Sequence, residues 1–159
     1  MGEALLLALA TNERINQLLL DHVDDGLWNT KPATQSGRTI AAIVSHMHNV
    51  RLMWLKVVAK GIEMPAKLER TSVTKQEAKE ALAASHRSLD GVLRKSLASG
   101  KVANFSAGPV GFVGYLIAHD GHHRGQISMQ LRQLGARLPD EVVMAMWDWP
   151  KLAREAVQH

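Results

Sequence analysis

Apolar residues recur every three to four positions in four long segments of the chain, and alternation at every second position is nearly absent. A period near 3.6 residues is typical of amphipathic helices, whereas a period of two is typical of strands. The pattern therefore predicts an all-α protein. Four helices of about 20 residues favour an up-down four-helix bundle, with room for one longer crossover and with a short additional C-terminal helix.

Polar and helix-breaking residues predict where these helices begin and end. The four long helices are expected over residues 3–23, 39–60, 74–100 and 110–134. A polar connection from Asn29 to Arg38 separates the first two, and Thr74 with Glu77 has the spacing of a capping box at the start of the third. A short tail helix is expected over residues 139–146, and Pro150 is expected to break any helix after it.

Composition narrows the function classes. With 159 residues and 46% hydrophobic content, the chain is expected to form one domain over residues 1–159. The absence of cysteine excludes disulfides and a cysteine nucleophile, so any thiol chemistry must use a thiol from a ligand. The run from Leu5 to Ala10 is too short to cross a membrane, and no signal sequence accompanies it, so the chain is interpreted as cytoplasmic with no membrane partner.

The net charge of +4 and the pI near 9.6 raise the question of a nucleic-acid partner. Lysine and arginine are scattered, however, with no cluster of five or six and no interleaved aromatic residues. No groove-reading helix is evident either. The charge is therefore interpreted as a solvated surface, and no nucleic-acid partner is expected.

Histidine spacing gives the strongest indication of chemistry. His119 and His123 lie four residues apart on the fourth helix, so both imidazoles are expected on one face and can share a metal ion. A third ligand would come from a facing helix, where His46 is the best candidate on an inward stripe. The alternatives remain open at this stage, because a single inward histidine is more often a hydrogen-bonded core residue and an isolated pair is a weak signal.

The inward stripe of the second helix is expected to contain His46 together with Ile43, Val50 and Met53. His48 competes with His46 for this role. It lies two residues further on, which is a rotation of about 200° on an ideal helix, so both cannot face the bundle core. Spacing alone does not choose between them.

The stretch His119-Asp-Gly-His-His123-Arg-Gly-Gln126 resembles the DinB/YfiT-like family, whose fourth helix carries two histidines four apart followed by Arg-Gly-Gln. The stretch from Thr39 to His46, with Trp54 after it, is similar to the family's second helix, which selects His46 over His48. The resemblance implies a DinB-like bundle that forms homodimers. It also implies a three-histidine site for zinc, nickel or a similar divalent ion, with coordination positions left for water or a small-molecule ligand.

Several relatives with such a site are similar to transferases that activate a low-molecular-weight thiol, such as bacillithiol or mycothiol. The resemblance thus implies a metal-dependent thiol S-transferase or, as a weaker alternative, a metal-dependent hydrolase. The alternative from another class is a non-catalytic dimeric bundle whose metal is structural or sensory. A fourth protein ligand, from His22, Glu3 or another carboxylate, would close the site and favour that alternative.

Neighbouring polar residues are candidates for a second shell or for substrate binding. They are Tyr115, Gln126, Asn49, His122 and Arg124. Tyr115 and Gln126 lie within one turn of the histidine pair, and Asn49 lies one turn after His46. Each also has a plain structural interpretation: a packed aromatic ring, a surface amide, a residue at the edge of the site, or a salt-bridging arginine.

Overall fold

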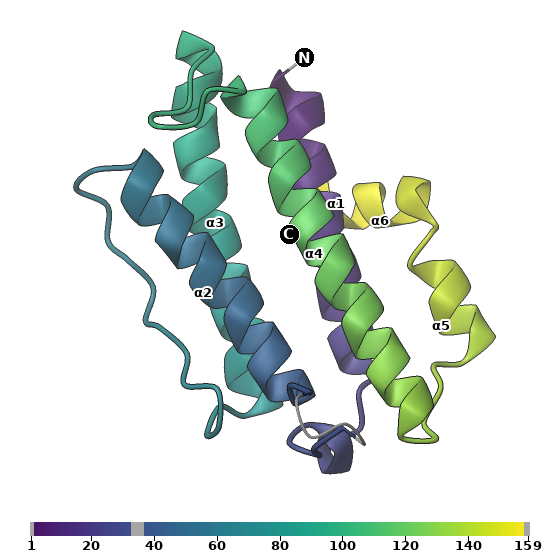
Figure 1. The fold of residues 1–159 in the computed structure, drawn as a ribbon. Coiled ribbons are helices and arrows are strands. Elements are labelled where there is room, and N and C mark those ends of the chain that lie inside the picture. The colour runs from purple at the N-terminus through teal and green to yellow at the C-terminus, as the bar shows by residue number, and fades with distance from the viewer. Residues whose placement is uncertain (1, 33–36, 158–159) are drawn as a thin grey trace.

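The computed structural model describes residues 2–32 and 37–157, and within them the chain is helical without strands (Figure 1). Its elements are α1 (Gly2–Asp21), η1 (Asp25–Leu27, a 3₁₀ helix), α2 (Ile40–Val58), α3 (Lys75–Ser99), α4 (Gly108–Gln133), α5 (Asp140–Ala145) and α6 (Trp149–Val157). The predicted all-α class and helical bundle are confirmed. Residues 33–36 of the predicted polar connection lie outside the described residues.

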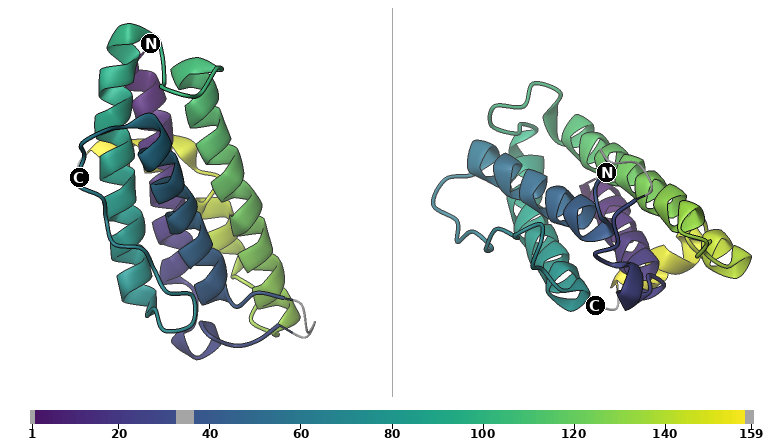
Figure 2. Two further views of the ribbon diagram at one scale, coloured as in Figure 1. Left: turned by 60° about the vertical axis from the view of Figure 1, so that its left-hand side comes forward. Right: turned by 60° about the horizontal axis from the view of Figure 1, so that its bottom comes forward.

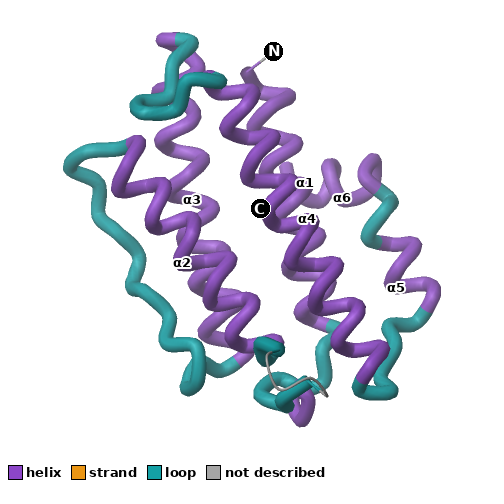
Figure 3. The backbone as a smooth tube through the Cα atoms, viewed as in Figure 1, coloured by secondary structure: helices purple, strands orange, loops and turns teal. Residues whose placement is uncertain are grey.

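The four long helices form the bundle. In Figure 1, α1 and α4 run in one direction and α2 and α3 in the other. α1 and α2 each pack against both α3 and α4, so α1 and α2 lie diagonally across the bundle. Because α2 and α3 are parallel, residues 59–73 return along their length as a crossover, visible in Figures 2 and 3. This is the longer crossover that the helix lengths allowed.

Local signals explain the helix ends. Thr74 and Glu77 form the predicted capping box, in which each side chain bonds the backbone N–H of the other. Thr39 caps α2 by accepting a hydrogen bond from the N–H of Ala42. Gly100, directly after α3, has φ +68°, a left-handed conformation that favours glycine. These ends agree with the predicted boundaries to within a few residues.

The expectation that Pro150 breaks the helix after it is wrong. Pro150 lies in the first turn of α6, where its missing N–H would have had no helical partner. α6 packs against α1, and Arg14 pairs with Glu155 at 2.8 Å. The chain therefore ends in two short helices, and proline starts the second of them. No helix in the described part of the chain combines the length and apolar character needed to span a membrane.

Polar residues divide the apolar core of the bundle into two clusters. One cluster contains Leu19, Ile40 and Ile127, and the other contains Leu9, Leu55 and Phe112. On each long helix a buried polar position falls between the two apolar sets. These positions include Asn12, Asn16, His48, Arg51, Ser85 and Asp120. The middle of the bundle is therefore polar, and the histidines lie at that level.

Candidate metal centre

His46, His119 and His123 come together between α2 and α4. One ring nitrogen from each lies within 4.8 Å of the others. The ring centroid of His46 is 5.4 Å from that of His119 and 4.8 Å from that of His123. Within residues 2–32 and 37–157 no fourth histidine or carboxylate joins this group. The structure thus brings together the three residues proposed as ligands.

The nitrogens of the α4 pair have the separation expected of neighbouring metal ligands. Nε2 of His119 lies 3.2 Å from Nε2 of His123. Two nitrogens bound at roughly 2.0–2.1 Å in a tetrahedral arrangement lie about 3.3–3.4 Å apart. Two neutral imidazoles that turn lone pairs toward each other repel unless a proton or a cation lies between them. The donor set therefore fits a divalent ion of the kind that imidazole binds, and the three histidines could hold one.

The protonation of the histidines also suits metal binding. Burial, followed by the positive charges of His123 and Arg38, lowers the pKa of His46 to about 4. Burial likewise lowers the pKa of His123, although its hydrogen bond with Gln126 acts in the opposite direction. Only a neutral imidazole has a lone pair for a metal ion. At neutral pH these two rings are therefore in the form that binds.

Gln126 and His122 orient the ring of His123. Nδ1 of His123 lies 2.8 Å from Oε1 of Gln126, and Nε2 of Gln126 lies 3.0 Å from Nε2 of His122. If the Gln126 oxygen accepts from Nδ1–H, the tautomer leaves the Nε2 lone pair facing His119. Both predicted neighbours are therefore adjacent to the three histidines, and His122 also packs edge-on against His123, with ring centroids 5.0 Å apart.

Asp120 lies behind His119. Its Oδ2 accepts hydrogen bonds from Asn12, Asn16 and Arg51 at 2.7, 2.9 and 2.7 Å. Its other oxygen, Oδ1, is 3.7 Å from Nδ1 of His119, which is too long for a hydrogen bond. A negative charge on that side favours the tautomer with its proton on Nδ1 and its lone pair on Nε2. Both rings on α4 are thus favoured in the tautomer that leaves the Nε2 lone pair free for a ligand.

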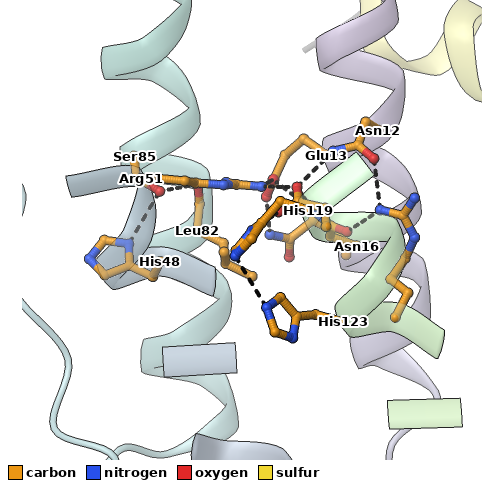
Figure 4. A network of polar contacts seen from close by, with 12 residues as sticks. Asn12, Glu13, Asn16, His48, Arg51, Leu82, Ser85, His119 and His123 are labelled. Atoms are coloured by element: carbon orange, nitrogen blue, oxygen red, sulfur yellow. Dashed lines mark hydrogen bonds and ion pairs between the residues drawn. The ribbon is translucent and has the colours of Figure 1, made fainter. Parts of the chain in front are cut away.

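Arg51 is the centre of this buried network (Figure 4). Its side chain extends from α2 and pairs with Glu13 of α1 at 2.8 Å and with Asp120 of α4 at 2.7 Å. Burial alone would raise the pKa of Asp120, but the Arg51 charge and the hydrogen bonds from Asn16 and Arg51 outweigh it and hold that pKa well below its usual range. Asp120 therefore stays ionised beside the histidines.

Sequence reasoning missed this network. Arg51, Asp120, Glu13, Asn12 and Asn16 are all buried, yet none was a candidate site residue. One signal was present: Asn12 and Asn16 are polar residues one helical turn apart, between Leu9 and Leu19 on the inward stripe of the first helix. Polar residues within an apolar stripe indicate buried partners on another helix.

His48 has the opposite surroundings to His46. It is fully buried, with Nδ1 3.2 Å from Oγ of Ser85 and Nε2 2.8 Å from the carbonyl oxygen of Ala66. The predicted inward stripe was wrong on this point, because Met53 is 48% exposed while His48 and Arg51 are buried. α2 faces α3 and the crossover with His48, and faces α4 with His46.

The remaining predicted neighbours differ in their distance from the site. The ring of Tyr115 stacks on His119 with centroids 6.0 Å apart, and it also packs against Trp54. Asn49 exchanges two hydrogen bonds of 3.0 Å with the backbone of Leu68, so it fixes the crossover. Arg124 donates to the side-chain oxygens of Asn12 and Asn16 at 2.7 and 2.6 Å. Its guanidinium therefore faces α1.

A cavity of about 850 Å³ opens beside the three histidines. Its other lining residues include Arg38, Ile43, His122, Gln126 and Met129. The volume lies in the range of small-molecule sites in proteins. Glu3 and His22, the two named candidates for a fourth ligand, are engaged elsewhere: Glu3 pairs with Arg94, and His22 bonds the carbonyl oxygen of Leu18. The histidines therefore face a space that can admit a ligand.

Comparison with known proteins finds one matching protein family. The sequence model of the DinB family matches residues 1–149. Searches of curated proteins and of solved structures return no significant match. The match includes all three histidines, the buried network, and the described part of the chain as far as the first residue of α6.

Proposed function

The chain belongs to the DinB family, and on that premise we propose that His46, His119 and His123 bind a divalent metal ion, zinc or nickel, in a metal-dependent enzyme. The observation that carries the proposal is the 3.2 Å approach of the two Nε2 atoms on α4, with His46 facing them. Three neutral donors would leave the charge of a bound ion uncompensated, and the cavity that they line could admit a further ligand to it. Such open sites are typical of catalytic rather than structural metal ions.

We propose a low-molecular-weight thiol as the co-substrate and S-transfer as the reaction. A divalent ion held here would lower the pKa of a coordinated thiol, so that the thiolate forms near neutral pH. The chain has no cysteine to compete for that role. Gln126 and Asp120 would hold the two α4 imidazoles in the binding tautomer, and the cavity would receive the electrophile.

The activity test uses protein loaded separately with zinc and with nickel. Thiols of low molecular weight are mixed with an electrophile such as 1-chloro-2,4-dinitrobenzene, and thioether formation is followed above the uncatalysed rate. Metal-dependent product formation that is lost in His46→Ala and kept in His22→Ala would support the proposal, since His22 is exposed and remote. Metal binding without product formation for any thiol would favour the non-catalytic alternative. Metal-dependent loss of the electrophile to water, without a thiol requirement, would favour the hydrolase.

We also propose that the protein is a homodimer. The observation that favours a second copy is a stripe of small or apolar exposed residues along α4, which ends at the exposed Arg132 and borders the exposed His122 and Gln126. The residues of this stripe are Val110, Gly114, Ala118, Gly121, Gly125 and Met129. A Cβ added at Gly114 or Gly125 would meet no atom within 4 Å among the described residues, so close packing inside this part of the bundle does not require these glycines. Sedimentation equilibrium should give twice the chain mass, and Gly125→Glu should give the monomer.

A further inference from the structure

The cavity beside the histidines has an unbalanced charge. Arg38 is the charged side chain that lines it, and among the described residues no aspartate or glutamate does. Besides the histidines, the remaining polar wall contains the neutral amides of Gln126, Gln130 and Gln133. A divalent ion on three neutral imidazoles would add to this positive charge. The cavity therefore offers cationic and neutral groups to a ligand.

Nearby carboxylates do not offset this charge. Asp120 and Glu13 both bind Arg51 in the buried network and lie behind the histidines rather than in the cavity wall. Within the described part of the chain, Arg38 forms no ion pair and donates no side-chain hydrogen bond to another residue. Among the described residues none therefore competes with a cavity ligand for this guanidinium.

Arg38 also has a fixed starting point on the chain. It directly precedes Thr39, whose side chain caps α2 and holds the backbone there. After burial, the Arg38 charge is one of the causes that lower the pKa of both His46 and His123, which places it within electrostatic reach of two proposed ligands. One small molecule in the cavity can thus approach the histidines and Arg38 at the same time.

We propose that the small-molecule ligand of this site is anionic, a thiol that carries a carboxylate, and that Arg38 is the specificity residue that binds the carboxylate. This proposal rests on the proposed metal function. If His46, His119 and His123 hold a metal ion, the thiol would bind it as the thiolate and its proton would go to solvent. The carboxylate is already ionised near neutral pH and forms charge-assisted hydrogen bonds with the guanidinium. No electron transfer and no further proton are required.

The test uses protein loaded with Co²⁺, whose absorption reports thiolate binding directly. Three thiols of similar size are titrated: 3-mercaptopropionate, 2-mercaptoethanol and cysteamine, which carry negative, neutral and positive second groups. A hydrogen-bonded charge pair is worth about tenfold to a hundredfold in affinity. We expect 3-mercaptopropionate to bind at least about tenfold more tightly than 2-mercaptoethanol, and cysteamine to bind most weakly.

Arg38→Gln should abolish the preference for 3-mercaptopropionate and leave the affinity for 2-mercaptoethanol nearly unchanged. Arg70→Gln is the matched control, because Arg70 also acts on His46 through its charge but does not line the cavity. It should keep the preference. A preference that persists in Arg38→Gln would show that the metal binds the carboxylate and would overturn the proposal.

The same titrations separate the two proposals. Wild-type protein that binds Co²⁺ but shows equal affinity for the three thiols would overturn the role of Arg38 and leave the metal site intact. Protein that does not take up Co²⁺ would overturn both proposals. Cobalt content is therefore measured before any thiol is added, and every variant is compared at the same metal loading.

Discussion

His46 and His48 lie two residues apart on α2 and have opposite surroundings. Both ring nitrogens of His48 have hydrogen-bonding partners, Ser85 on α3 and Ala66 in the crossover. The ring of His46 makes no hydrogen bond within the described residues and lies beside the rings of His119 and His123. A satisfied imidazole stabilises the fold, whereas an unsatisfied one beside two others remains available for a ligand. One side of α2 therefore packs the fold through His48, and the other side presents the candidate ligand His46.

The largest expected effect comes from the buried side of α2. Arg51→Leu would leave Glu13 and Asp120 buried and unpaired, and breaking a buried ion pair from one partner costs about 3–5 kcal/mol. Urea unfolding should show this loss in the free energy of unfolding. Arg94→Leu is the control, because its pair with Asp90 is exposed and the urea midpoint should hardly move. Equal effects of the two substitutions would contradict a special role for the network.

The second-largest expected effect is the difference in the free energy of unfolding between the His48→Ala and His46→Ala variants. His48→Ala would leave Ser85 and the Ala66 carbonyl without their partner, at a cost of about 1–3 kcal/mol. His46→Ala should change the stability of chelator-treated protein by less than about 0.5 kcal/mol, because no hydrogen bond is lost. Thermal and urea unfolding of both variants provide the measurement. A larger loss of stability in His46→Ala than in His48→Ala would contradict the different roles of the two residues.

The ring orientation of His123 allows a finer test of the side of α2 that faces the cavity with His46. Gln126→Ala removes the acceptor 2.8 Å from Nδ1, and loss of such an outer contact weakens metal binding by about 10–100-fold. Gln133→Ala is the matched control, because this amide lines the same cavity but forms no hydrogen bond with a histidine among the described residues. Isothermal titration with zinc would measure both. Unchanged affinity in Gln126→Ala would remove Gln126 from the site.

The pH dependence of the metal-free fold tests the same comparison through protonation of His46. The pKa of His46 is lowered from 6.5 to about 4, so between these values the unfolded chain binds a proton that the folded chain does not. Stability should therefore be fully present above pH 6.5 and decrease as the pH falls toward 4. Unfolding curves of chelator-treated protein should show this slope, and His46→Ala should reduce it. A slope identical in both proteins would exclude His46 as a contributor.

The sequence predicted the features that depend on neighbouring residues. The capping box of Thr74 and Glu77 and the shared face of His119 and His123 are local consequences of helical geometry, and both are present. The predicted inward stripe of the second helix favoured His46 while His48 remained a competitor, and the family resemblance selected His46. Partners on other helices decide between them.

Features that depend on distant partners could not be predicted from one helix at a time. Arg51 and Asp120 are separated by 69 positions, and each looks like a surface residue until the other is placed beside it. The same cause explains the wrong prediction for Met53: the period of α2 was read from apolar residues, while its buried face is partly polar. Burial of charge is a property of the pair rather than of either residue.

Metal content tests the central claim most directly. The protein is purified without an affinity tag, reconstituted with zinc or nickel, desalted and measured by elemental analysis, together with His46→Ala, His123→Ala and His48→Ala, each verified as folded by circular dichroism. We predict one bound ion per chain in the wild type and in His48→Ala, and loss of the ion in His46→Ala and His123→Ala. A wild-type protein that retains no metal after reconstitution, or a His46→Ala variant that retains it fully, would contradict the account.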